Sequence, residues 1–192
     1  MLSPLDELLW AIIGLLLTIG GIFIEASMPI PSWPLDFSQV HTYPLGITFQ
    51  IGAVLLVGCL GGKNAGALAQ IAYLALGLSG VQVFTQGGGL TYLKEPTFGY
   101  LLGFLPGAWI CGYLAFHKPL RLEFLALSCL GGLLAIHITG LVYLEGLSLL
   151  QLLSGSWWEA AWQYSGQPFP GQLVIICAVA VISLILRRLL FY

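Results

Sequence analysis

The chain has 192 residues, of which 58% are hydrophobic and only 7% are charged, and its formal net charge is −2. A soluble globular domain carries roughly 25% charged residues, so these values and a mean hydropathy of +0.95 exclude that class. They predict an integral membrane protein in contact with lipid, for which no nucleic-acid partner is expected.

Six apolar segments are long enough, or nearly long enough, to cross a bilayer. A spanning helix needs roughly 20 apolar residues, or about 17 when it is short. The segments are residues 8–24, 46–60, 65–78, 97–116, 122–144 and 173–190. The second and third are short, as helices beside a cavity within the membrane would be. The sequence therefore predicts an all-α membrane protein with six transmembrane helices in one domain, residues 1–192.

The connection after the first segment, residues 27–45, contains Pro29, Pro31, Pro34 and Pro44. Proline disfavours a helix and stiffens an extended chain. We therefore expect this connection to be extended and to cap a cavity in the bundle.

The run of residues 58–64, at the junction of the second and third segments, reads GCLGGKN. A phosphate-binding loop needs a glycine five residues before Gly62 and a serine or threonine after Lys63, where Val57 and Asn64 stand. The mismatch predicts a tight cytoplasmic turn. No hydrolase signature is present either, so we expect neither an enzyme nor a protein that energises transport alone.

Residues 77–104 form the segment around which the rest of the chain is expected to be organised. Gly80, the triplet at 87–89 and Pro96 interrupt two apolar runs there. Glycine permits a positive φ, and proline stops a helix. Non-helical backbone at membrane depth persists only where protein or a water-filled cavity satisfies its polar groups. We therefore expect a looping element that forms one wall of a cavity.

Lysine and arginine are enriched in cytoplasmic loops. With the N-terminus inside, the inner loops hold Lys63, Lys118, Arg121, Arg187 and Arg188, whereas the outer loops hold only Lys94. Both termini are therefore expected in the cytoplasm, which places residues 145–170 outside. That segment is rich in leucine and tryptophan, and amphipathic rings favour the headgroup level, so we expect a helix along the outer interface.

Uncharged polar side chains gather at the outer helix ends of this topology. They include Thr48, Gln50, Gln82, Thr85, Gln86, Thr97, Tyr100 and Gln172. A buried amide without a partner is costly, so these groups either bond one another or bind a polar ligand. Helix N-termini near Thr97 and Leu173 would offer free N–H groups to a carboxylate. Lys94 is either a further contact to that anion or an ordinary solvated lysine.

His137 lies in the middle of the fifth segment. An ionisable group at that depth belongs either to a proton relay or to a neutral histidine bonded to a neighbouring helix. The second reading is favoured because no other titratable residue lies deep in a segment. Four cysteines, Cys59, Cys111, Cys129 and Cys177, are scattered through apolar stretches without a C-x-x-C pair. Such thiols act as small hydrophobes, so we expect no disulfide, no metal site and no cofactor.

Five short motifs occur in order along the chain. They are Pro44-x-x-x-Thr48-Phe49-Gln50, Leu60-Gly61 with Gly66, Tyr73-x-x-x-Gly77-x-x-Gly80-Val81-x-Val83-Phe84, Pro96-Thr97-x-Gly99-Tyr100-x-x-Gly103-Phe104, and Pro168-Phe169-Pro170-Gly171. As an ordered set they resemble the BioY family of biotin transporters, the substrate-binding S components of energy-coupling factor transporters. The resemblance extends over most of the chain from Pro44 onward.

The resemblance implies an S-component-like bundle that takes up biotin through the cytoplasmic membrane of a prokaryote, or a membrane of an organelle of bacterial descent. A separate energy-coupling module, with a transmembrane partner and two ATPase subunits, would supply the energy, in agreement with the missing phosphate-binding loop. In the first segment, Ala11, Gly14 and Thr18 are small residues that would let a partner helix approach.

One departure concerns the ligand. The family usually continues after its proline and glycine with Asp-x-x-Lys, where this chain has Gln172 and Ile175. Either recognition has shifted to Gln86, Gln172, Lys94 and the helix ends, or the ligand is a relative of biotin or a different vitamin. Two further alternatives are a non-transporting membrane scaffold and a proton-linked carrier that uses His137.

The residues expected to bind the substrate come from the second, third, fourth and sixth segments and from the loops beside them. They are Thr48, Gln50, Tyr73, Phe84, Gln86, Lys94, Thr97, Tyr100 and Gln172. The rings of Tyr73, Phe84 and Tyr100 would enclose the apolar part of the ligand. The amide and hydroxyl groups would hydrogen-bond its polar ends.

Overall fold

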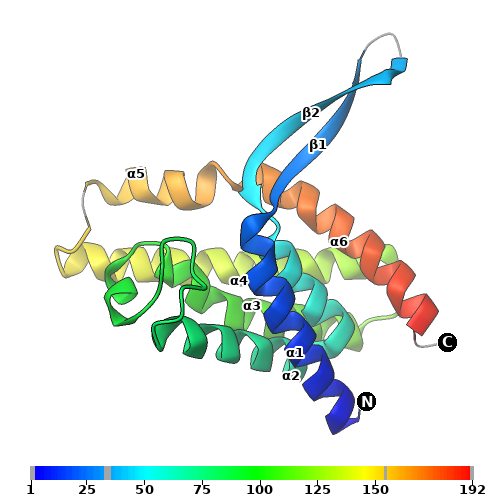
Figure 1. Cartoon of the computed structure of the whole chain (residues 1–192), viewed down its shortest axis with the longest axis horizontal. Coiled ribbons are helices and arrows are strands. Elements are labelled where there is room, and N and C mark those ends of the chain that lie inside the picture. The colour runs from blue at the N-terminus through cyan, green and yellow to red at the C-terminus, as the bar shows by residue number, and fades with distance from the viewer. Residues whose placement is uncertain (1–2, 33–35, 154, 191–192) are drawn as a thin grey trace.

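The structure of the chain is a computed structural model that describes residues 3–32, 36–153 and 155–190, with only the backbone described for residues 28–42. Five helical segments within this part of the chain are long and apolar enough to cross a membrane, as expected of a multi-pass membrane protein. They are Pro4–Phe23, Gln50–Leu78, Phe98–His117, Leu122–Leu149 and Trp157–Leu190. Figure 1 shows the helices as one bundle from which a two-stranded ribbon projects.

Helix α1 (Pro4–Gly20) buries its small residues against α2 (Gln50–Leu78). A Cβ at Gly14 would lie 2.7 Å from the Val57 side chain, and Thr18 Oγ1 accepts a 3.2 Å hydrogen bond from Gln70. The expectation that Ala11, Gly14 and Thr18 face a partner helix is therefore wrong. These residues let two helices of the same chain approach closely.

Strands β1 (Glu25–Ser32) and β2 (Asp36–Thr48) form an antiparallel pair that runs from Glu25 opposite Thr48 to Ser32 opposite Asp36. The expected extended connection is confirmed. The chain is mostly helical rather than all-α, because these two extended segments satisfy their backbone groups by pairing. Both are edge strands, where the missing N–H of a proline is tolerated. The far end of the ribbon projects from the helices (Figure 1), whereas its base packs on α6, where Leu45 and Ile47 lie against Gly171. Pro34 lies outside the described residues.

Gly62 divides α2 into two helical halves, which correspond to the predicted segments 46–60 and 65–78. Its φ of 78° and ψ of −176° are not helical, and a positive φ favours glycine. The predicted turn between the two segments is therefore a sharp bend at this residue. Helix α3 (Phe98–His117) packs closely on the bend, because a Cβ at Gly112 would overlap the backbone of Gly62 and Lys63.

The second half of the chain completes the bundle. Helix α3 packs between α2 and α4 (Leu122–Leu149). Helix α4 continues past its predicted end at residue 144, and the charged Glu145 is accommodated within it because its side chain is exposed. The predicted interface helix is short: α5 (Trp157–Ala161) and a π-helical turn (Trp162–Gly166) run back along α4 (Figure 1). Trp158 and Trp162 are exposed on it. Helix α6 (Phe169–Leu190) then packs on α2 and α4.

The four cysteines are free thiols. They are scattered along the sequence, but the close packing of α2, α3 and α4 brings Cys59, Cys111 and Cys129 together in the core. Only Cys177, on α6, is exposed.

The predicted looping element is confirmed between α2 and α3, where residues 79–97 contain only a 3-10 helix, Leu90–Lys94. The Phe84 ring lies on Gly77, at which a Cβ would overlap it. The Gly89 N–H donates a 2.7 Å hydrogen bond to the Gly77 carbonyl, and the Phe84 backbone exchanges two hydrogen bonds with Gly87. A residue without a side chain at position 77 therefore lets the loop lie directly on the end of α2.

This contact generates a prediction about stability. Gly77→Ala should destabilise the protein by about 1–3 kcal/mol, because the new methyl group overpacks against Phe84. Gly146→Ala is the matched control, since a Cβ at this second helical glycine meets no atom within 4 Å. It should be neutral or stabilising by up to about 1 kcal/mol, the helix propensity difference. Unfolding in detergent measures both changes.

A Phe84→Ala background should remove most of the cost of Gly77→Ala, with a coupling free energy of about 0.5–3 kcal/mol. Equal effects of Gly77→Ala in the two backgrounds would contradict the proposed contact.

Candidate functional site

A chain of hydrogen bonds joins both halves of α2 to the loop. Gln50 opens α2, and its Nε2 donates to Tyr73 Oη at 2.8 Å. Tyr73 Oη in turn donates to the carbonyl of Val83 at 3.0 Å. Gln50 and Tyr73 are buried, so the bonds satisfy polar groups that have no access to water. The loop is thereby held at the end of the bundle opposite Gly62.

Four aromatic rings, Tyr73, Phe84, Tyr92 and Phe98, form what we call the Phe84 cluster. The ring centroids of Tyr73 and Phe84 are 5.3 Å apart and nearly perpendicular, and those of Phe84 and Tyr92 are 4.7 Å apart. Tyr92 Oη lies 3.0 Å from Thr97 Oγ1. Burial raises the pKa of Tyr92, so its phenol stays neutral at physiological pH. The four rings are buried against one another, and the hydroxyl groups of Tyr73 and Tyr92 are hydrogen-bonded at the edge of the cluster.

A second polar set, the His137 group, contains Tyr100, His137, Ser165 and Gln172 from α3, α4, the π-helical turn and α6. Tyr100 Oη lies 2.7 Å from Ser165 Oγ, which lies 2.9 Å from His137 Nδ1. His137 Nε2 lies 2.7 Å from Gln172 Oε1. These bonds match the favoured reading of His137 as a histidine bonded to a neighbouring helix.

The direction of these hydrogen bonds follows from the acceptor at one end. A carbonyl oxygen only accepts, so His137 Nε2 carries a proton and donates to Gln172. In a neutral imidazole, Nδ1 then accepts from Ser165, whose oxygen accepts from Tyr100. The NH₂ of Gln172 makes no hydrogen bond to the described residues and remains available as a donor.

The structure brings six of the nine predicted substrate-binding residues into these two sets of contacts. They are Gln50, Tyr73, Phe84, Thr97, Tyr100 and Gln172. The other three stand apart. Thr48 is half-buried at the end of β2, and Gln86 and Lys94 are exposed on the loop.

One expected helix start is wrong. Helix α3 begins at Phe98, beside Thr97 as predicted, but α6 begins at Phe169 rather than near Leu173. The N–H of Gln172 already donates to the Pro168 carbonyl at 3.0 Å. The free N–H groups expected at Leu173 are therefore used within the helix.

Ser165 and Tyr92 were not anticipated as members of the site. Ser165 lies in a π-helical turn, and no local sequence pattern marks such a turn. Ile175, at the position where the resemblance implies lysine, is buried, and its Cγ2 would lie 2.8 Å from a Cβ at Gly52. The apolar side chain thus packs between α6 and α2.

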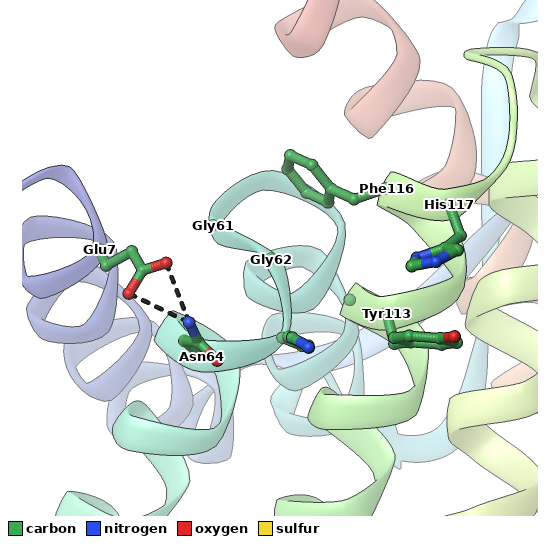
Figure 2. A pocket seen from close by; sticks show the side chains of 9 residues that line it. Glu7, Gly61, Gly62, Asn64, Tyr113, Phe116 and His117 are labelled. Atoms are coloured by element: carbon green, nitrogen blue, oxygen red, sulfur yellow. Dashed lines mark hydrogen bonds between the residues drawn. The ribbon is translucent and has the colours of Figure 1, made fainter. Parts of the chain in front are cut away.

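Two cavities lie elsewhere, and none of the nine predicted residues lines them. One, of about 350 Å³, opens beside the Gly62 bend, where Asn64 donates hydrogen bonds of 3.0 and 3.3 Å to Glu7 (Figure 2). His117 stacks on Tyr113 at its edge, with ring centroids 4.2 Å apart. The other, of about 300 Å³, is an apolar groove between α1, α2 and α6.

Comparisons with known proteins give one consistent result. The sequence model described as the BioY family matches residues 5–191. A probable biotin transporter BioY of Lysinibacillus sphaericus is 37% identical over 73% of this chain and 66% of its own length. The biotin transporter BioY of Thermotoga maritima is 39% identical over 66% of this chain and 72% of its own.

Two further matches cover nearly the whole chain. An uncharacterised 21.2 kDa protein of Cyanophora paradoxa is 29% identical over 95% of both chains. A crystal structure described as the S-component for biotin from an ECF-type ABC transporter shares the fold, with a TM-score of 0.71 and 21% identity over 98% of this chain and 95% of that one. By the family match over residues 5–191, the chain belongs to the BioY family.

Proposed function

We propose that this protein is the substrate-binding S component of a biotin transporter of the energy-coupling factor type. The BioY family match over residues 5–191 carries this proposal, and the relatives named as biotin transporters support it. Binding and release of a vitamin require no bond chemistry. The family therefore agrees with the expectation that the chain is not an enzyme.

The proposed arrangement in the membrane has six spans. The two halves of α2 on either side of Gly62 cross separately, and both termini face the cytoplasmic side of the cell membrane. Five of the six Lys and Arg residues then lie on the cytoplasmic side, which supports this orientation. The end of the bundle that carries the loop 79–97 and the His137 group would face outward.

Biotin has an apolar ring and chain, a ureido group and a carboxylate, and the outer end offers a matching set of groups. The Phe84 cluster would enclose the apolar part. The free NH₂ of Gln172 would donate to the ureido carbonyl, with Thr97, Gln50 and Tyr100 nearby in the same end of the bundle. A ligand here would exchange hydrogen bonds with groups that already bond one another.

The carboxylate of biotin needs a cation that α6 does not supply, because Ile175 is packed in the core. Lys94 is exposed on the loop at this end and would supply it, with Gln86 as a neighbouring polar group. Thr48 would contribute at the start of α2. Gln172 stands in place of an acidic residue and offers a donor. It therefore favours a second candidate ligand, a biotin relative or another vitamin whose group beside Gln172 is a stronger acceptor.

Energy would come from a separate module with a transmembrane partner and two ATPase subunits. The chain lacks the phosphate-binding loop that an ATPase requires. The outer end of this chain alone would determine which substrate is transported.

Gln172→Ala should lower biotin affinity by about 1–3 kcal/mol, roughly 5- to 150-fold, because it removes a buried donor and leaves His137 without its acceptor. Gln163→Ala is the matched control, since this exposed glutamine precedes the same helix, and it should bind as the wild type does. Retention of radiolabelled biotin by the purified proteins measures both. Gln86→Ala should also weaken binding; unchanged affinity in Gln172→Ala and Gln86→Ala together would remove this site assignment.

His137→Leu should weaken biotin binding by a similar factor, because Ser165 and Gln172 both lose a partner. Uptake by cells should nevertheless stay insensitive to an uncoupler in both proteins, since the histidine is a structural donor and acceptor. Uptake that needs a proton gradient in the wild type and loses that requirement in His137→Leu would instead support the proton-linked carrier.

Affinity purification in mild detergent from the native host should recover ATPase subunits together with this chain. Mass spectrometry of the eluate identifies them, and ATP hydrolysis by the eluate measures their activity. A stable preparation that binds biotin but recovers no ATPase would argue against a dedicated module while leaving the binding function intact.

A further inference from the structure

Three buried cysteines from three helices meet in the core of the bundle. Cys59 lies in the first half of α2, Cys111 in α3 and Cys129 in α4, and each has no exposed surface. Cys59 Sγ lies 3.5 Å from both Cys111 Sγ and Cys129 Sγ, and all three sulfurs lie within 4.8 Å of one another. We call these three residues the cysteine cluster.

The spacing of the sulfurs fits a shared metal ion. A soft metal about 2.3 Å from each of three sulfurs in one plane holds those sulfurs about 4 Å apart. Two of the observed separations are 3.5 Å and the third is at most 4.8 Å, so small side-chain shifts suffice. Among the described residues no histidine, aspartate or glutamate joins the cluster, which favours three-coordination over the four ligands that zinc prefers. We propose that the cysteine cluster binds one copper(I) ion through three sulfurs.

The charge of the proposed site follows from the protonation states of its three ligands. Copper(I) held by two thiolates and one thiol carries a net charge of −1, and the two displaced protons leave to water with no change in oxidation state. Arg187 Nη1 donates a 2.9 Å hydrogen bond to the carbonyl of Ala115 on α3, a residue of the same core cluster as the three cysteines. A cation in this part of the bundle limits the cost of burying that negative charge.

A second polar group beside the cluster supports this proposal. Ser183 of α6 is fully buried, and its hydroxyl has no hydrogen-bond partner among the described residues, although the Cys59 thiol lies beside it. Buried hydroxyl groups are seldom left without a partner. A thiolate at Cys59 is a stronger acceptor than a thiol, and it would give this hydroxyl a bond to donate.

The cavity beside the Gly62 bend is lined by residues that are close to two of the ligands along the chain. Gly61 and Gly62 in its lining (Figure 2) follow Cys59 closely in the chain. Gly112, also in the lining, follows Cys111 directly. An ion carried to this cavity therefore comes within a few residues of two of its three ligands.

The test uses the full-length reduced protein in detergent, under anaerobic conditions, with copper(I) buffered by a competing chelator. The wild type should retain one copper per chain, with three sulfur neighbours in its X-ray absorption spectrum, and its melting temperature should rise with copper. Cys59→Ala, Cys111→Ala and Cys129→Ala should each lower copper affinity by at least about 100-fold, the upper end of the loss seen for outer-shell partners.

Cys177→Ala is the matched control, because this cysteine is exposed and outside the cluster, and it should bind copper as the wild type does. Melting without copper verifies that each alanine variant is folded, since alanine keeps the site apolar. The proposal is overturned if the wild type retains no copper, if the triple alanine variant retains as much, or if nitrogen replaces sulfur around the ion. In each of those outcomes the thiols serve packing alone.

Discussion

The contact between Phe84 and Gly77 holds the irregular part of this protein in place. Backbone outside a helix must find partners at the depth of a membrane, and the loop 79–97 finds them on α2 itself. The Tyr73 hydroxyl bonds the Val83 carbonyl, and the Gly77 carbonyl accepts from Gly89. Because position 77 has no side chain, the edge of the Phe84 ring and the backbone of Gly89 both approach the end of the helix closely. The loop is thus anchored to the core of the bundle through Val83, Phe84 and Tyr92.

The same end of the bundle carries a directed series of hydrogen bonds. It runs from Tyr100 through Ser165 and His137 to Gln172, and it joins α3, α4, the π-helical turn and α6. When His137 is neutral, each of these contacts joins one donor to one acceptor, and the amide NH₂ of Gln172 is left as a donor. An ionised acidic residue at position 172 would present only acceptors, whereas the glutamine presents a donor as well.

The opposite half of the bundle is built differently. Glycines at positions 62 and 112 bring α2 and α3 into close contact, and thiols fill the adjacent core. One end therefore presents aromatic rings and polar groups on an irregular loop, while the other is compact around sulfur. In the proposed orientation the first end meets the substrate outside, and the second lies toward the cytoplasm.

Hydropathy, glycine and proline act locally along the chain, so the membrane class, most helix positions and the break at residues 77–104 could be predicted from the amino-acid sequence. Ordered motifs also pointed to the family. Three features became visible only in the folded chain: β1 and β2 pair as a ribbon, α6 begins at Phe169, and Ser165 joins His137. Folding also brought three distant cysteines together. Each of these features depends on which helices or strands lie side by side. Contacts between remote segments leave no local pattern in the chain.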